Sequence, residues 1–133
     1  MTLNEEMTHN QTDSTNMPMA LVVEDDPDLV EIFQMALEAA GFEPMFISDG
    51  QVAIDTLPNI NPQLIVLDLH LPHVSGAEIL GAIRSSDHLK DVRVILASAN
   101  PRWADELRSL VDLILDKPVS YRQLRDFAAR FKR

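Results

Sequence analysis

Four short apolar runs in this chain each end directly in polar or charged residues, and this recurrence is the strongest constraint on its fold. The runs are Ala20-Leu21-Val22-Val23, Leu64-Ile65-Val66-Leu67, Val94-Ile95-Leu96-Ala97 and Leu113-Ile114-Leu115. The residues that follow them are, in turn, Glu24-Asp25-Asp26, Asp68, Ser98 and Asp116-Lys117-Pro118. Such continuous apolar runs are typical of strands buried on both faces of a parallel sheet. Polar groups at the ends of these strands indicate chemistry at that edge of the sheet.

Helical patterns alternate with the apolar runs from Met19 onward. We predict strands at Met19–Val23, Glu43–Ile47, Leu64–Asp68, 93–97 and 113–115. Short connections and right-handed crossovers between such strands place helices on both faces of the sheet. The predicted fold class is therefore α/β, a doubly wound five-stranded parallel sheet with the flavodoxin-like order 2-1-3-4-5. In that order the winding reverses between the first and third strands, beside Asp25, Asp26 and Asp68.

Capping signals indicate where the helices begin. Asp26 is a candidate N-cap with Pro27 in the first helical position, and Gly41 is placed to end that helix. Further helices are predicted to begin at Asp49-Gly50 (stopping at Pro58), near Gly76 after the capping-box pair Ser75 and Glu78, at Pro101, and after Ser120, which pairs with Gln123.

Length and composition restrict the class of protein. The chain has 133 residues, 46% of them hydrophobic, which suits one domain with a real core. It has no cysteine, which excludes disulfides and thiolate metal sites, and its net charge of −10 argues against direct DNA binding. Since it has no membrane-spanning run and no signal-peptide pattern, we expect a cytoplasmic protein with no membrane contact. We predict a disordered tail over residues 1–18 and one folded domain over residues 19–133.

The acidic residues at the predicted sheet edge favour a magnesium site. Carboxylates packed together repel one another, and Mg²⁺, a hard cation that prefers oxygen ligands, removes that repulsion. Lys117 adds a positive charge near the same edge, and Ser98 adds a hydroxyl. These groups together make a phosphoryl-transfer site in which Asp68 can attack phosphorus.

Simpler roles are available to several of these residues. Asp25 or Asp26 can cap the first helix, and for Asp26 capping and site duty can coexist. Two histidines on one loop, such as His70 and His73, are more often surface residues than metal ligands. Trp103 is interpreted as a packing residue or a partner anchor.

The motifs, taken in order, resemble the receiver domain of bacterial two-component response regulators. The segments that carry the resemblance are Val22-Val23-Glu24-Asp25-Asp26-Pro27, Ile65-Val66-Leu67-Asp68-Leu69-His70-Leu71-Pro72 with Gly76, Ile95-Leu96-Ala97-Ser98-Ala99 and Asp116-Lys117-Pro118. They are similar to the family's first strand and acidic pair, its phosphoacceptor strand and loop, its switch-hydroxyl segment, and its lysine with the following, typically cis, proline. The resemblance extends from about Met19 to Lys132.

The resemblance implies a role for each site residue. Asp68 would be the phosphoacceptor. Asp25 or Asp26 would bind Mg²⁺ together with Asp68, with Asp26 the preferred direct ligand, and the backbone carbonyl of His70 would complete the metal shell. Ser98 would follow the phosphoryl group inward. Lys117 would contact that group.

The chain departs from the family pattern in two places. Ile114 stands three residues before Lys117, where the family usually has Tyr or Phe. The segment between Ser98 and Lys117 is a few residues short, and it reads Leu110-Val111 where a Gly-Ala pair is common. We therefore expect a short or displaced fourth helix and an altered output surface.

The expected function is that of a stand-alone phosphoacceptor response regulator in a two-component system or phosphorelay. It would accept a phosphoryl group on Asp68 from a sensor histidine kinase or a phosphotransfer protein and would then bind a downstream protein. It would not be an enzyme, apart from self-catalysed phosphoryl acceptance and hydrolysis. Because the sequence ends just after the fifth predicted helix, we expect no DNA-binding module.

Other functions fit the pattern less well. An aspartyl-nucleophile phosphatase of related fold commonly places a general-acid Asp two residues after the nucleophile, where this chain has His70. A flavodoxin-like binding module would need a phosphate-cradling loop after the first strand, where Glu24-Asp25-Asp26 would repel phosphate. The presence of every expected site residue argues against a degenerate receiver that is never phosphorylated.

Overall fold

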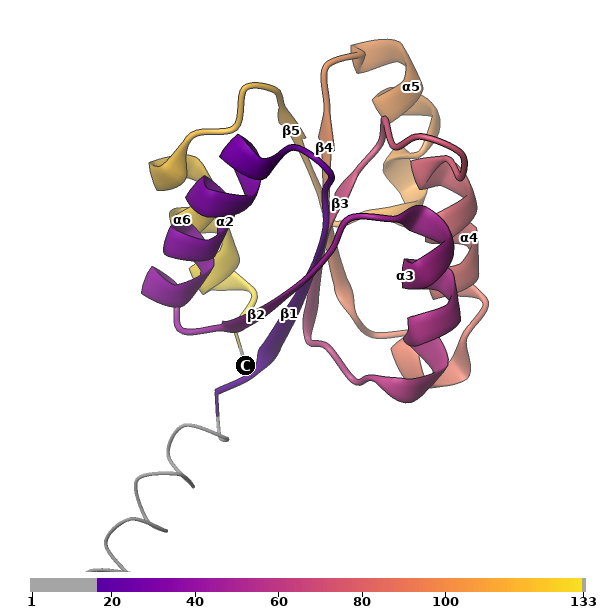
Figure 1. Cartoon of the computed structure of the whole chain (residues 1–133), viewed down its shortest axis with the longest axis horizontal. Coiled ribbons are helices and arrows are strands. Elements are labelled where there is room, and N and C mark those ends of the chain that lie inside the picture. Colours follow the sequence, from indigo (N-terminus) through magenta and orange to yellow (C-terminus); the bar gives the residue numbers. More distant parts are fainter. Residues whose placement is uncertain (1–16, 133) are drawn as a thin grey trace, which may run out of the picture.

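The computed structural model describes residues 17–132, so the predicted tail at residues 1–18 lies almost wholly outside the described residues. Five strands alternate with five helices over this range (Figure 1). The strands are β1 Met19–Val23, β2 Glu43–Ile47, β3 Leu64–Asp68, β4 Arg93–Ser98 and β5 Leu113–Asp116. The helices are α2 Pro27–Ala39, α3 Gly50–Thr56, α4 Gly76–Arg84, α5 Pro101–Glu106 and α6 Tyr121–Arg130. Short 3₁₀ turns at Leu57–Asn59, Asp87–Leu89 and Arg108–Leu110 follow α3, α4 and α5.

The strands form one parallel sheet in the order β2-β1-β3-β4-β5, which confirms the predicted fold class and topology. Two strands run one residue further than the sequence indicated. β4 includes Ser98 and β5 includes Asp116, and these two residues are level with each other in the sheet. Asp68 in β3 is level with Ala97 in β4. The carboxyl ends of the three strands are therefore nearly flush.

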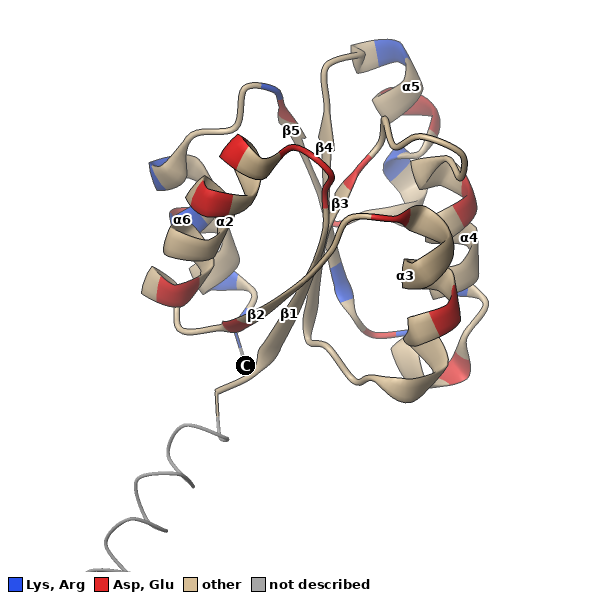
Figure 2. Ribbon diagram, viewed as in Figure 1, with Lys and Arg blue, Asp and Glu red and all other residues tan. Residues whose placement is uncertain are grey.

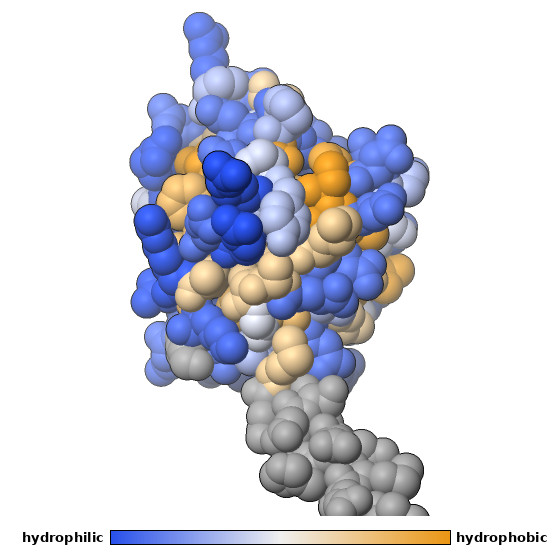
Figure 3. Space-filling view, turned by 90° about the vertical axis from the view of Figure 1, so that its left-hand side faces the viewer, coloured by the Kyte–Doolittle hydropathy of each residue, from blue (hydrophilic) through white to orange (hydrophobic). Residues whose placement is uncertain are grey.

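Helices cover both faces of the sheet and give it two separate cores. Figure 1 shows α2 and α6 on one face and α3, α4 and α5 on the other. Alternate residues of each central strand point to opposite faces because the side-chain period of a strand is two residues. Leu21 and Ile65 thus pack beneath α3 and α4, whereas Val22 and Val66 pack beneath α2 and α6. The outer surface over α2 and α6 is mostly hydrophilic, with a few apolar side chains between the polar ones (Figure 3).

The predicted capping residues begin their helices. Side-chain oxygens of Asp49, Ser75 and Ser120 each accept a hydrogen bond from a backbone N–H in the first turn of the following helix. Asn100, which the sequence analysis did not identify, caps α5 in the same way. The expectation of a short fourth helix is confirmed, since α5 has only 6 residues. No helix among residues 17–132 is long and apolar enough to span a membrane.

Candidate functional site

The carboxyl ends of four strands bring acidic and basic side chains together at one edge of the sheet. Glu24 follows β1 directly, Asp68 and Ser98 are the last residues of β3 and β4, and Lys117 follows β5 directly. Figure 2 shows the acidic residues gathered at the end of β1 and beside the end of β3. The order of strands, with β1 next to β3, is what places these segments side by side.

Asp68 is buried and paired with a lysine. Its side chain is 2% exposed, and its Oδ1 lies 2.9 Å from the Nζ of Lys117. The same oxygen accepts a hydrogen bond from the backbone N–H of His70 at 3.0 Å. A buried carboxylate needs such partners, because leaving it unpaired in the interior costs several kcal/mol. Both contacts fall on Oδ1, so the second oxygen, Oδ2, carries neither of them.

Glu24 is a second buried carboxylate beside Asp68. Its side chain is 1% exposed and its Oε1 lies 3.5 Å from Lys117 Nζ. Oε2 accepts from the backbone N–H groups of Asp25 and Asp26, each at 3.2 Å. Oε1 has no hydrogen-bond partner among the described residues. The site therefore contains a buried carboxylate oxygen that is only partly compensated.

The pKa values of the pair reflect burial and crowding. Burial, together with the neighbouring Asp68, raises the pKa of Glu24 from 4.5 to about 7, although Lys117 and the Asp26 N–H oppose the shift. For Lys117, burial acts to lower the pKa, but the hydrogen bond and charge of Asp68 and the charge of Glu24 outweigh it and raise the pKa above 10.5. Lys117 thus stays charged at neutral pH while Glu24 is held in its charged form only weakly.

Three carboxylates at this edge form a set of oxygen ligands. One oxygen from each of Glu24, Asp25 and Asp68 lies within 4.8 Å of the others. Asp25 is exposed, so the cluster is open to solvent on one side. Hard divalent cations such as Mg²⁺ favour carboxylate oxygens and retain waters in an open coordination site. The donor set and the Glu24 Oε1, which has no hydrogen-bond partner among the described residues, both fit a Mg²⁺ ion.

The structure places Asp26 differently from the other two acids that follow β1. Its Oδ1 accepts a hydrogen bond from the Asp28 N–H at 2.9 Å, which makes it the N-cap of α2. It does not belong to the three-carboxylate cluster. The structure therefore brings Asp25 and Asp68 together, as predicted, and assigns the third position to Glu24 instead of Asp26.

Sequence reasoning did not select Glu24 as a site residue, but a signal was present. Glu24 continues the β1–β2 pairing past the end of β1, because its backbone N–H donates to the Ile47 carbonyl at 3.1 Å. The first acid after a buried strand is still in the ladder and remains buried, whereas the next two leave it. Counting from the end of the apolar run Leu21-Val22-Val23 would have favoured Glu24 and Asp25.

Gly76 lets the loop after β3 pack closely against the site. A Cβ atom at Gly76 would lie 2.7 Å from the Leu69 Cα and 2.9 Å from the Asp68 carbonyl oxygen, closer than such atoms can approach. The loop also contains a tight turn in which the Val74 N–H donates to the Pro72 carbonyl at 2.8 Å, with His73 at φ 70°. The segment that carries Asp68 and His70 is thereby fixed at its far end.

The Ser98 hydroxyl is buried and fully engaged. Ser98 is 1% exposed. Its Oγ accepts from the Asn100 N–H at 2.9 Å, donates to the Asn100 carbonyl at 3.0 Å, and lies 3.2 Å from His70 Nε2. The backbone pairing of β4 with β5 continues past β5, because the Lys117 N–H donates to the Ser98 carbonyl at 2.9 Å. The peptide bond between Lys117 and Pro118 is cis.

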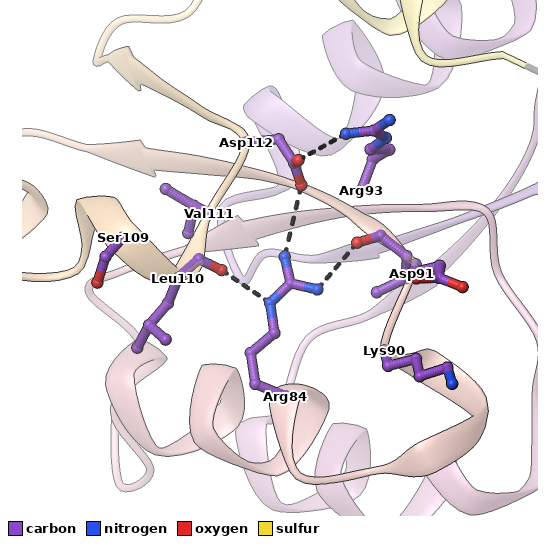
Figure 4. Close-up of a pocket in the computed structure, with 9 residues that line it drawn as sticks. Arg84, Lys90, Asp91, Arg93, Ser109, Leu110, Val111 and Asp112 are labelled. Atoms are coloured by element: carbon purple, nitrogen blue, oxygen red, sulfur yellow. Dashed lines mark hydrogen bonds and ion pairs between the residues drawn. The ribbon is translucent and has the colours of Figure 1, made fainter.

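A second charged cluster surrounds a hollow of about 600 Å³ at the opposite edge, near the amino ends of β4 and β5 (Figure 4). There the Arg84 guanidinium donates to the carbonyls of Leu110 and Val92 at 2.8 and 3.0 Å and to Asp112 at 3.4 Å. Asp112 also accepts from Arg93 at 3.0 Å. Each of these charges has its partner within the protein, so this cluster joins α4 to the segment before β5.

Comparison with known proteins identifies the family. The model of the response regulator receiver domain matches residues 20–129. The polar-differentiation response regulator DivK of Brucella anthropi is 31% identical over 108 residues, covering 78% of this chain and 88% of DivK.

Solved structures of receiver domains have the same fold. The signal receiver domain of a LuxO repressor protein from Vibrio parahaemolyticus is 28% identical, with a TM-score of 0.77 over 86% of this chain and 88% of that one. The receiver domain of the Pseudomonas aeruginosa sensor histidine kinase PA1611 is 24% identical, with a TM-score of 0.77 over 86% and 96% of the two chains; it holds a magnesium ion in its active-site cleft. Fold, family model and relatives agree, and the chain belongs to the response regulator receiver domain family of two-component signalling.

Proposed function

We propose that this receiver domain is phosphorylated on Asp68 and signals through the protein partner that its phosphorylated form binds. The observation that carries the proposal is the pairing of a buried Asp68 with Lys117 at 2.9 Å, beside further carboxylates. A carboxylate can act as a nucleophile towards phosphorus and form an aspartyl phosphate. Lys117 supplies the compact positive charge that an incoming phosphoryl group requires.

Phosphoryl transfer to Asp68 forms one bond to phosphorus and breaks another. Asp68 attacks the phosphorus of the donor through Oδ2, since Oδ1 is held by Lys117 and the His70 N–H. A new oxygen–phosphorus bond forms, and the bond from phosphorus to the donor's leaving group breaks with its electron pair on that group. Lys117 is placed to contact the transferred group, because it already lies against the same carboxylate. Water later removes the phosphoryl group by hydrolysing the acyl phosphate on Asp68.

We assign Mg²⁺ binding to Asp25 and Asp68, with the backbone carbonyl of His70, and with Glu24 as the buried acid behind them. When bound, the cation neutralises carboxylates and phosphoryl oxygens that would otherwise repel each other. Asp26 is assigned to the cap of α2 by its bond to the Asp28 N–H. We choose Asp25 over Asp26 because carboxylate oxygens of Glu24, Asp25 and Asp68 lie within 4.8 Å of one another.

The phosphoryl donor is a sensor histidine kinase or a histidine phosphotransfer protein, and small acyl phosphates substitute for it in vitro. The downstream target is a protein, and the protein acts in the cytoplasm, where such kinases present their phosphohistidines. Turnover of an added phosphomonoester is not expected. His70 stands where a phosphatase of related fold would have its acid, and the ring of His70 is engaged with Ser98.

The test is phosphorylation followed by intact-mass measurement. Acetyl phosphate with Mg²⁺ should add one phosphoryl group to the wild-type chain and none to Asp68→Asn, which keeps the shape of the side chain. Asp116→Asn, a change of an exposed acid one residue before Lys117, is the matched control and should label like wild type. Undiminished labelling of Asp68→Asn would refute the assignment.

A further inference from the structure

The ring of His70 links the Ser98 hydroxyl to the only tryptophan of the chain. His70 Nε2 lies 3.2 Å from Ser98 Oγ. On its other side the imidazole stacks on the Trp103 indole, with ring centroids 5.3 Å apart and planes 26° from parallel. His70 comes from the loop after β3, Ser98 from the end of β4, and Trp103 from the first turn of α5. Three segments of the site edge are thus joined through one side chain.

The Ser98 hydroxyl cannot keep its present bonds and also bond a phosphoryl group. A hydroxyl has one proton and two lone pairs. In the structure the oxygen accepts from the Asn100 N–H and the remaining capacity is divided between the Asn100 carbonyl and His70. If the proton is donated to a phosphoryl oxygen on Asp68, the bond to the Asn100 carbonyl is lost. The hydroxyl then has to turn towards Asp68, which changes the geometry of its contact with His70.

Trp103 has room to respond. Its side chain is 52% exposed, and its indole stacks on the His70 ring. A largely apolar hollow of about 240 Å³ lies beside it and is lined by Leu69, Ala77 and Leu107 together with Ser75 and Glu106. Trp103 also lines a second hollow of about 540 Å³, together with His70, Asp25 and the loop that follows β3. A shift of the indole would change the shape of both.

We propose that His70 is a positioning residue that couples the Ser98 hydroxyl to Trp103, so that the state of the phosphorylation site sets the conformation of the indole and of the apolar hollow beside α5. The inference rests on the proposed phosphorylation of Asp68. A shift of the Ser98 hydroxyl moves the imidazole that it contacts, and the Trp103 indole stacked on that imidazole rearranges with it. Ile114 of β5 has no ring, and it is a partly buried residue that packs against the core, so it does not contribute an aromatic group to this link.

Trp103 fluorescence tests the coupling without labels, since the chain has one tryptophan. In the unphosphorylated protein, Ser98→Ala should already alter the emission intensity or wavelength, because it removes the bond that orients His70. His70→Asn should alter it more, because the stacked ring is lost. His73→Asn is the matched control: it lies in the same loop, Asn tolerates the positive φ, and the emission should match wild type.

The second arm adds acetyl phosphate and Mg²⁺, with intact mass measured on the same samples. Wild type and His73→Asn should show a change in Trp103 emission that follows the added mass. His70→Phe keeps a ring over Trp103 but has no nitrogen to bond Ser98, so it should keep a stacked indole whose emission changes little when mass is gained. Circular dichroism shows that each variant is folded.

The outcomes separate the two proposals. No added mass in wild type refutes the proposed phosphorylation, whatever the fluorescence. Added mass in wild type with an unchanged Trp103 emission refutes the coupling. So does a full emission change in mass-labelled His70→Phe, or wild-type emission in unphosphorylated Ser98→Ala.

Discussion

The two edges of the sheet both gather charged side chains, but these side chains are fully hydrogen-bonded at one edge and not at the other. Around Arg84, each donor group of the guanidinium has an acceptor and Asp112 is held by Arg84, Arg93 and the Val94 N–H. At the carboxyl edge, one ammonium faces two buried carboxylates, and Glu24 Oε1 has no hydrogen-bond partner in the described part of the chain.

The difference indicates which cluster serves structure and which serves chemistry. A satisfied buried charge stabilises the contacts that hold it and has nothing left to offer a ligand. An excess of carboxylates with a perturbed pKa is a cost to the fold that a cation or a phosphoryl site can offset. The charged cluster around Arg84 thus connects α4 to the segment before β5. The hollow that it surrounds has a larger volume than either hollow beside Trp103, but its charged groups are already paired.

Removing the Arg84 side chain from its fully hydrogen-bonded cluster should have the largest effect on stability. We expect Arg84→Ala to lower the free energy of unfolding by about 3 kcal/mol, because the Val92 and Leu110 carbonyls and Asp112 lose a charged donor in a partly buried setting. Urea unfolding measures this. Mg²⁺ affinity should not change, and a loss of stability below about 1 kcal/mol would contradict the structural role.

Removing the Glu24 carboxylate from the carboxyl edge of the sheet should instead stabilise the metal-free protein. Because burial raises the pKa of Glu24 to about 7 in the fold, its stabilising contribution is complete below pH 4.5 and is lost as the pH rises through about 7. In the presence of a chelator, wild type should lose on the order of 2 kcal/mol over that window. The Glu24→Gln variant should not show this loss of unfolding free energy, and it should be more stable than wild type at pH 7.5.

Thermal unfolding at several pH values with EDTA checks this prediction. Lys117 does not contribute to the slope, because its pKa is raised above 10.5 and it stays charged over the whole window. Parallel curves for wild type and Glu24→Gln would show that Glu24 titrates normally in the fold.

Two neighbouring acids should differ in their effect on Mg²⁺ binding. Asp25→Asn should weaken the affinity at least about tenfold, equivalent to about 1.4 kcal/mol, because it removes a carboxylate from the cluster. Asp26→Asn should leave the affinity nearly unchanged, since Asn still caps α2. Titration calorimetry with MgCl₂ measures both. An equal loss in Asp26→Asn would restore the sequence prediction that Asp26 is the direct ligand.

The smallest effect is expected where a charge pair is exposed. Arg108 donates to the Oδ1 of Asp105 in α5 from Nη2 at 2.9 Å and from Nε at 3.1 Å, with both side chains largely exposed. Arg108→Ala should change the free energy of unfolding by less than about 0.5 kcal/mol, because solvent already screens the pair. This variant is the control for Arg84→Ala, and a comparable loss from both would mean that burial does not distinguish the two arginines.

The sequence by itself determined the class of fold and the edge at which the site lies. The alternation of apolar runs with capped helical patterns and short crossovers specified a parallel sheet with helices on both faces, and the predicted order 2-1-3-4-5 is the one observed. Asp68 and Lys117 were selected as candidate site residues because a charged residue at the end of a buried strand indicates chemistry at that edge of the sheet. These signals are local, and local chemistry is what a sequence displays.

The tertiary structure decided which neighbour each side chain has. Glu24 replaces Asp26 in the carboxylate cluster because the β1–β2 ladder extends one residue past β1, and α2 claims Asp26 for its cap. His70 contacts Ser98 and Trp103 only because three separate segments meet at one edge. Ladder length, capping and packing compete for each side chain, and that competition is settled by contacts between residues far apart in the chain.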